Sequence, residues 1–261
     1  MDIGPGTRAI VSGATSGIGA ATSRALAARG ARVGLMARGE EGLASLSGEL
    51  PDSIELRADV GDAGAVEAAV ARFAEEGGVE LVVANAGTAR SGPFLELDPT
   101  EAEEMVRVNF VGTLNLIRSA VPLMLDRGRG HVVVVSSAAA LRAFPWTAVY
   151  AGTKAAQRAF AEAFRHELSG TGVSLTTVYP GEVESSLHAH EPERVPDWLR
   201  RGDAIAPEPV AEAIVEAVVE DRRQVHVPGN VRLLGLNALA PGLIDRLVAL
   251  LRGGSAAPRR Y

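Results

Sequence analysis

Short apolar runs alternate with amphipathic, alanine-rich segments along most of the chain. The apolar runs are rich in β-branched residues and are almost continuously hydrophobic, as in "GHVVVVSS", which is typical of strands buried on both faces of a parallel sheet. These runs predict strands at residues 8–13, 31–37, 53–59, 80–87, 130–137 and 172–180, with a weaker one at 223–229. Apolar positions at helical spacing predict helices between them, at 18–29, 40–50, 63–75, 99–126, 148–168 and 207–220.

The alternation predicts an α/β fold, a doubly wound parallel sheet of Rossmann type with about seven strands, in a single domain over residues 1–261. Two segments do not follow it. Residues 181–206 come after the sixth strand, where ligands bind in such sheets, and we expect a substrate lid there, with an ordinary surface excursion as the alternative. Residues 231–261 form a variable C-terminal segment whose apolar positions favour one or two short helices, packed on the domain or a partner chain, or else an interfacial membrane helix.

Composition narrows the classes of function. A formal net charge of −6 argues against a nucleic-acid or anionic-membrane surface, and the absence of cysteine excludes disulfides and thiolate metal sites. "HAHE" at 188–191 lacks a third well-placed ligand, so no metal site is expected. The N-terminal sequence has no signal-peptide pattern and no apolar run is long enough to span a bilayer, so we expect a cytoplasmic protein without an integral membrane span.

The first strand-to-helix turn, "VSGATSGIGA", contains Gly13, Gly17 and Gly19. Glycines at this place let the backbone turn sharply and approach a pyrophosphate, while the N-terminus of the following helix offers its partial positive charge. The spacing Gly-x3-Gly-x-Gly differs from the common dinucleotide fingerprint. A tight turn without a ligand is the alternative, because the chain has 29 glycines.

Further along, "NAG" spans residues 85–87 and a tyrosine and a lysine stand four apart at Tyr150 and Lys154. Ser137 lies thirteen residues before Tyr150, Asn109 falls in the long predicted helix, and "PGEVES" spans residues 180–185. Each motif is weak alone. Jointly, in this order, they resemble the short-chain dehydrogenase/reductase family over residues 7 to 186. The resemblance implies an NAD(P)-dependent oxidoreductase that transfers a hydride between NADP(H) and a carbonyl or secondary alcohol.

The chemistry of the four residues suits that reaction. A nearby ammonium favours the phenolate, so Lys154 is expected to lower the pKa of Tyr150, which then acts as general acid or base. Ser137 would donate to the substrate oxygen. The resemblance further implies that Lys154 binds the nicotinamide ribose and that Asn109 holds a water linking Lys154 to solvent. An exposed helix pair without function is the alternative, and a non-catalytic NADP(H) sensor is another.

The second predicted strand ends at Ala37, where a carboxylate would favour NAD, and Arg38 follows. An arginine suits a 2′-phosphate, so NADP(H) is preferred and NAD(H) stays possible; the alternative is that Arg38 is a solvated loop residue. Asp59 resembles the acidic residue that contacts adenine, with a plain helix-entry aspartate as the alternative. The expected cofactor-binding residues are Gly13, Thr15, Ser16, Gly17, Ile18, Gly19, Arg38, Asp59, Val60, Asn85, Ala86, Gly87, Tyr150, Lys154, Pro180, Gly181, Val183 and Ser185.

Apolar residues near the expected lid predict an apolar substrate pocket, lined by Ala138, Phe144, Trp146, Leu187 and Trp198. The partner is a small carbonyl or alcohol, with a membrane-peripheral reductase of lipid-like ketones as an alternative. Ser12 and Ser185 stand where the family usually has threonine, and the C-terminal region lacks the glycine-rich ending of many relatives. That ending often takes part in tetramer contacts, so we expect a homodimer through the helices around Asn109 and Tyr150, with a tetramer possible.

Overall fold

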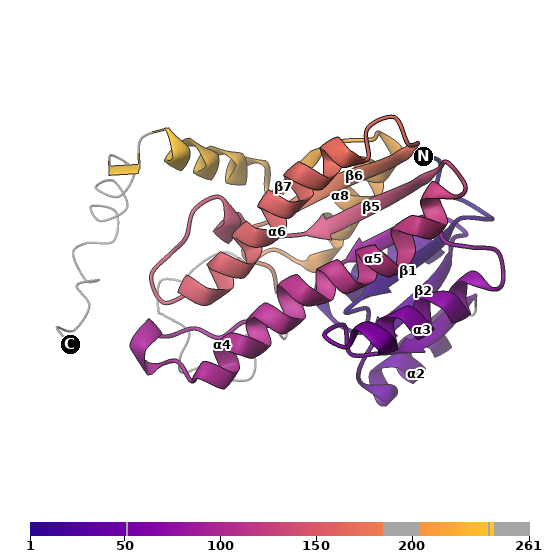
Figure 1. Cartoon of the computed structure of the whole chain (residues 1–261), viewed down its shortest axis with the longest axis horizontal. Helices are drawn as coiled ribbons and strands as arrows, with labels where there is room; N and C mark the ends of the chain where they lie inside the picture. The colour runs from indigo at the N-terminus through magenta and orange to yellow at the C-terminus, as the bar shows by residue number, and fades with distance from the viewer. Residues whose placement is uncertain (51, 185–203, 240, 243–261) are drawn as a thin grey trace.

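Seven parallel strands form one sheet in the computed structural model, which describes residues 1–50, 52–184, 204–239 and 241–242 (Figure 1). The strand order is β3-β2-β1-β4-β5-β6-β7, so the direction of winding reverses between β1 and β4. The α/β doubly wound prediction is confirmed. The strands are β1 (Arg8–Ser12), β2 (Arg32–Ala37), β3 (Ser53–Arg57), β4 (Leu81–Ala84), β5 (Gly130–Val135), β6 (Val173–Pro180) and β7 (Gln224–Val227).

Helices cover both faces of the sheet. On one face pack α1 (Gly17–Ala27), α2 (Glu40–Glu49) and α8 (Pro207–Val219). On the other pack α3 (Ala63–Ala74), α5 (Gly112–Leu125) and α6 (Ala148–Glu167). Successive strand residues alternate between the two cores, as Val11 and Ile10 of β1 do, which explains why the strands have continuous apolar runs.

The prediction of one uninterrupted helix over 99–126 is wrong in its middle. The structure has α4 (Pro99–Met105), a π-helical stretch η2 (Val106–Val111) and then α5. The N–H of Gly112 donates to the carbonyl of Arg107, five residues earlier, so one extra residue is accommodated in the turn. The spacing of apolar residues in the sequence does not reveal one extra residue in a helical turn, so the π-helical stretch was not predicted. By length and composition Pro99–Leu125 would also pass as a membrane span, but half of its most apolar window is buried in the fold.

Most predicted strands extend one to three residues too far at their carboxyl ends, and β4 shows why. β3 stops at Arg57, and β4 stops at Ala84, before "NAG". The N–H groups of Asn85 and Ala86 donate to the hydroxyl of Ser12 instead of continuing the ladder, at 3.0 and 3.1 Å. Side-chain bonding of this kind replaces strand pairing and ends the strand.

The predicted lid falls largely outside the described residues, which leave out 185–203 and with them Ser185, Leu187 and Trp198. The described residues on either side of this gap lie close together, because Val183 forms a parallel β-bridge with Ile205. In the C-terminal segment a 3-10 helix, η5 (Gly229–Ala238), follows β7 and leads away from the sheet (Figure 1).

Candidate active site

The glycine turn between β1 and α1 forms a cradle that side chains would fill. Gly13 and Gly17 have φ values of +64° and +49°, which favour glycine. A Cβ on Gly19 would lie 2.0 Å from the carbonyl oxygen of Gly13, so no side chain fits there. Ser16 at the N-cap of α1 makes no side-chain capping bond, and no acidic residue lies in the first turn. The concave backbone and the positive end of α1 therefore fit a pyrophosphate.

Asn85, the residue after β4, stabilises this cradle through hydrogen bonds. Its side-chain amide donates to the carbonyl oxygens of Ser12 and Gly13, at 3.0 and 3.3 Å. A Cβ on Gly13 would lie only 2.9 Å from the Cα of Ala86. The carboxyl ends of β1 and β4, where the strand order reverses, are thus locked together at the place where such sheets bind ligands.

Asp59 follows β3 and is held by two donors. Its carboxylate accepts the N–H of Gly61 at 2.9 Å and an Nη1 bond from Arg107 at 3.0 Å. Burial opposes ionisation most strongly, but these two bonds and nearby positive charge outweigh it, so the pKa of Asp59 is lowered. Asp59 does not cap the next helix, because Asp62 is the N-cap of α3. The role of Arg107, which lies in the π stretch and bonds Asp59, could not be predicted from the sequence.

Arg38 lies just past the end of β2, with 63% of its side chain exposed. Its Nη1 is 3.8 Å from the Oε1 of Glu104, a loose contact compared with most ion pairs of the chain. Val60 is buried and packs on α5, where a Cβ on Gly112 would come within 2.6 Å of it. An exposed, loosely paired guanidinium can turn to bind a phosphate.

The predicted serine, tyrosine and lysine come together at the carboxyl end of β5. Ser137 follows the strand, and Tyr150 and Lys154 lie on one face of α6. Tyr150 and Ser137 are hydrogen-bonded. Lys154, 4% exposed, donates from Nζ to the carbonyl of Val135 at 2.9 Å, and Nζ lies 5.8 Å from the centroid of the Tyr150 ring.

Burial controls the ionisation of this pair. It raises the pKa of Tyr150, and the hydrogen bond from Ser137 only partly opposes that effect. It lowers the pKa of Lys154 to about 7. The expected lowering of the Tyr150 pKa by Lys154 is therefore not found in the protein alone, where desolvation of the phenol is the dominant effect. The lysine instead changes protonation near neutral pH, where acid–base groups are most effective.

Asn109 lies in the π stretch and is fully buried. Its side chain accepts the N–H of Thr88 at 2.7 Å and donates to the Thr88 carbonyl and to the hydroxyl of Thr153, at 2.9 and 3.0 Å. Thr153 and Gln157 are polar residues of this network that the sequence analysis missed. Their spacing was a usable signal, since Tyr150, Thr153, Lys154 and Gln157 form one polar stripe at i, i+3, i+4 and i+7.

The expected nicotinamide and substrate residues lie at the same edge of the sheet. Pro180 ends β6, and the N–H of Gly181 donates to the carbonyl of Val227 at 2.7 Å. Ala138, Phe144 and Trp146 belong to the connection between Ser137 and Tyr150, where Trp146 is 43% exposed and has a φ of +69°. Their contact with a substrate stays a prediction.

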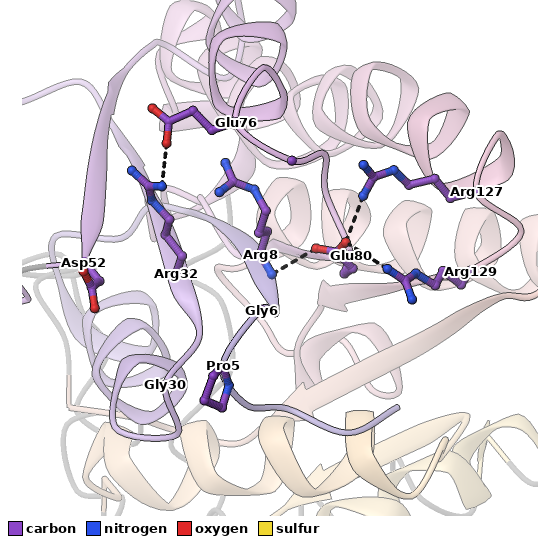
Figure 2. A pocket seen from close by; sticks show the side chains of 11 residues that line it. Pro5, Gly6, Arg8, Gly30, Arg32, Asp52, Glu76, Glu80, Arg127 and Arg129 are labelled. Carbon is purple, nitrogen blue, oxygen red and sulfur yellow. Dashed lines mark hydrogen bonds and ion pairs between the residues drawn. The ribbon is translucent and has the colours of Figure 1, made fainter.

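A hollow in the described part of the chain lies at the opposite edge of the sheet. It measures about 940 Å³ and is lined by charged residues at the starts of the strands (Figure 2). Glu80 accepts the N–H of Arg8 at 3.0 Å and pairs with Arg127 at 2.9 Å, while Arg32 pairs with Glu76. Glu76 and Glu80 thus pair with most of the arginines that line the hollow, and none of the predicted site residues lines it. We place the chemistry at the carboxyl edge.

Comparisons with known proteins identify the family of the chain. The family model described as short chain dehydrogenase matches residues 7–195. The chain is 38% identical over 234 residues to the glycine betaine reductase ATRR of Emericella nidulans, covering 86% of this chain but 18% of that protein. It is 34% identical to an uncharacterized oxidoreductase of Myxococcus xanthus, covering 92% of this chain and 96% of the relative.

Solved structures of dehydrogenases share the fold of this chain. A short-chain dehydrogenase/reductase from Burkholderia phymatum in complex with NAD superposes with a TM-score of 0.85 at 25% identity, covering 93% of this chain and 96% of that one. An alcohol dehydrogenase from Thermococcus sibiricus complexed with 5-hydroxy-NADP gives a TM-score of 0.75 at 29% identity, covering 84% and 94%. Both nicotinamide dinucleotide types therefore occur among the neighbours.

Proposed function

Because the chain belongs to the short-chain dehydrogenase/reductase family, we propose that it transfers a hydride between NADP(H) and a carbonyl or secondary alcohol, with Tyr150 as general acid and base. The observation that carries the proposal is the grouping of Ser137, Tyr150 and Lys154 at the carboxyl edge, beside the glycine cradle. Lys154 is moreover the sole lysine among 26 basic residues. Arginine stays protonated at any physiological pH, so a lysine, unlike an arginine, can exchange protons at this position.

The nicotinamide, when bound, supplies or accepts the hydride. The glycine turn and the N-terminus of α1 would hold its pyrophosphate, and Asp59 with Val60 would border its adenine. Ser137 Oγ accepts the N–H of Ala139 at 3.1 Å, and its hydroxyl, which bonds Tyr150 in the protein alone, would turn to donate to the substrate oxygen. Tyr150 gives its proton to that oxygen in reduction and takes it back in oxidation. Lys154 sets the charge beside the phenol.

The first test measures NADPH oxidation with a panel of ketones, aldehydes, quinones and 3-oxoacyl thioesters. Tyr150→Phe should lower kcat by about 100-fold or more, because it removes the proton donor. Tyr179→Phe, which removes a buried tyrosine hydroxyl from β6, is the matched control and should retain turnover. Tight NADPH binding without turnover on any substrate would instead support a non-catalytic sensor.

The preference for NADP(H) has its own test. Arg38→Ala should raise KM for NADPH far more than KM for NADH, because the guanidinium is proposed to bind the 2′-phosphate. Arg57→Ala, at the end of β3 with its side chain 66% exposed, is the control and should change neither. Equal effects of Arg38→Ala on both cofactors would defeat the assignment.

We also propose that the active protein is a homodimer through the helices around Asn109 and Tyr150. Val106 and Val111, both in the π stretch, are 44% and 37% exposed and offer apolar surface that a second copy of the chain could cover. Light scattering after size exclusion should give twice the chain mass, and Val106→Glu with Val111→Glu should give the monomer.

One observation favours a second candidate, a membrane-peripheral reductase of lipid-like ketones. Residues three apart lie on one side of a 3-10 helix, and in η5 Val231 and Leu234 face the domain. The neighbouring stripe, Leu233, Leu236 and Leu239, is 57%, 49% and 82% exposed. Replacing these three leucines by serine should abolish sedimentation with phospholipid vesicles, whereas Val219→Ser, at the C-terminal end of α8, should not affect it. Failure of the unaltered protein to bind vesicles would eliminate this candidate.

A further inference from the structure

The hollow at the amino edge contains a buried arginine that makes no ion pair within the described part of the chain. Arg8 is 7% exposed, and its guanidinium lies over the ring of Phe73 at 4.5 Å. It donates from Nε to the carbonyl of Gly78 at 3.0 Å and from Nη2 to the carbonyl of Phe73. A guanidinium has five N–H groups, so these two bonds leave three donors unused. A buried charge without a counter-charge is costly, and an anion in the hollow would remove that cost.

Arg32 adds a second unused donor beside Arg8. The two residues are paired in register at the starts of β1 and β2, about 4.8 Å apart, and their side chains extend together into the hollow (Figure 2). Burial lowers the pKa of Arg8, and the neighbouring charge of Arg32 lowers it further. Arg32 Nε is buried and has no hydrogen-bond partner among the described residues. Its Nη1 pairs with Glu76 at 2.5 Å, but both side chains are partly exposed, so an anion can replace this carboxylate.

Two further arginines, on the other side of the hollow, share one carboxylate. The Nη1 of Arg127 is 2.9 Å and the Nη2 of Arg129 is 3.7 Å from the Oε1 of Glu80. Glu80 is mostly buried, whereas the side chain of Arg129 is 72% exposed. A contact of 3.7 Å made by so exposed a side chain is loose, so Arg129 can turn toward a ligand.

Two adjacent glycines bring these two pairs of arginines to one place. Gly77 and Gly78 precede β4 and have φ values of +139° and +86°. A Cβ on Gly77 would lie 3.2 Å from the Cδ of Arg8, and a Cβ on Gly78 would lie 2.3 Å from the Cζ of Arg127. Consecutive Cα atoms are only about 3.8 Å apart, so one arginine of each pair packs on the same short stretch of backbone.

The lining of the hollow has an excess of positive charge, although the whole chain has a net charge of −6. Its four arginines face three carboxylates, those of Asp52, Glu76 and Glu80. Guanidinium groups bind phosphate oxygens in a bidentate manner, which favours phosphate among anions. A volume of about 940 Å³ suits a metabolite better than a single inorganic ion.

We propose that this hollow binds a small anion with two neighbouring phosphate groups, one at each pair of arginines. Arg8 Nη1 and Arg32 Nε would donate to one phosphate group. Arg127 and Arg129 would donate to the other. The chemistry shared by the possible ligands is the diphosphate group, either as free pyrophosphate or as the tail of a nucleoside diphosphate. The site lies at the opposite end of the strands from Tyr150, so the proposal does not rest on the proposed reaction.

Calorimetric titration of the protein saturated with NADP⁺ tests the proposal, because the cofactor keeps phosphate out of the glycine cradle. Pyrophosphate should bind once per chain and at least about tenfold more tightly than orthophosphate at equal ionic strength. Equal affinity for ADP would identify a nucleotide tail as the ligand, and weaker binding of ADP would identify the free anion. If the protein does not bind NADP⁺, the Gly19→Ala variant, whose cradle is obstructed, takes its place.

Variants locate the bound anion. Arg32→Gln should weaken pyrophosphate binding by about tenfold or more, because it removes a charged donor. Arg24→Gln is the matched control, since it removes the same charge from a partly exposed pair with Glu49 away from the hollow, and it should change Kd by less than about twofold. Glu76→Gln should tighten binding, because it removes the carboxylate that competes for Arg32.

The direction of these changes separates binding from folding. A merely structural role of Glu76 would not make its loss increase the affinity for an anion. If Arg32→Gln does not fold, Arg129→Gln, at an exposed position, replaces it and should also weaken binding. The proposal would be overturned if pyrophosphate did not bind at millimolar concentration, or if Arg24→Gln weakened binding as much as the variants in the hollow.

Discussion

The single lysine of the chain carries a pH-dependent contribution to stability. Burial lowers the pKa of Lys154 to about 7. An exposed lysine in the unfolded chain titrates near pH ~10.4. Below about pH 7 the residue is charged in both states, so the folded state bears the full cost of burying an ammonium. Between these two pH values the unfolded chain binds a proton that the folded chain does not, and the free energy of unfolding therefore rises with pH.

Lys154→Met should remove that rise, which amounts to a few kcal/mol. Urea unfolding of both proteins from neutral to alkaline pH measures the difference directly. Because no other lysine is present, protein labelled with ¹⁵N-lysine should also give one side-chain signal that titrates near pH 7. The interpretation would be contradicted if the free energy of unfolding depended on pH in the same way in both proteins. It would also be contradicted if the lysine signal titrated near the pKa of an exposed lysine.

Gly19 is the residue on which the cofactor cradle depends most sharply. Its Cβ would lie 2.0 Å from the Gly13 carbonyl oxygen, so Gly19→Ala must displace the turn or the start of α1. We expect NADPH binding to weaken by at least about tenfold and stability to fall by about 1–3 kcal/mol. Calorimetric titration and thermal unfolding measure the two effects. Gly48→Ala, in α2 with no atom within 4 Å of its Cβ, should instead be neutral or stabilising.

Among the elements, those defined by burial could be predicted from the sequence, and those defined by one hydrogen bond could not. The five inner strands were visible because they are buried on both faces, whereas the edge strands β3 and β7 are only partly buried. The π stretch was not visible, because the apolar spacing in 99–126 continues across it while Gly112 bonds five residues back to Arg107. For the same reason the sequence predicted Asn109 in a helix but neither its contact with Thr88 nor the pairing of Arg107 with Asp59.

Ser12 joins two strands through one hydroxyl, which makes the β1–β4 junction testable. It is 2% exposed, and its Oγ accepts the N–H groups of Asn85 and Ala86. Ser12→Ala leaves both N–H groups without that acceptor and should cost about 2 kcal/mol or more in the free energy of unfolding, measured by urea denaturation. Ser12→Thr keeps the hydroxyl and should restore most of it. Equal losses for alanine and threonine would show that volume, not the bond, matters.

At the scale of the whole molecule, the two edges of the sheet have different roles. The carboxyl edge holds the glycine cradle and the Tyr150 site, while the amino edge is a hollow organised by charge (Figure 2). Glu80 is central there, since its carboxylate, 10% exposed, meets the N–H of Arg8 and the guanidinium of Arg127. Residues at this edge should therefore affect stability and leave catalysis unchanged.

Glu80→Gln tests that division. It keeps the shape of the side chain but removes the charge from a mostly buried carboxylate, so the free energy of unfolding should fall by about 1–2 kcal/mol after allowance for the partly exposed Arg127. Glu49→Gln breaks an ion pair with Arg24 whose partners are 47% and 49% exposed, and it should cost almost nothing. Because the hollow and Tyr150 lie at opposite ends of the strands, both variants should keep kcat and KM within about twofold of the unaltered protein. A large loss of kcat in a fully folded Glu80→Gln variant would mean that the amino edge is coupled to the reaction. That outcome would contradict the proposed separation of roles between the two edges.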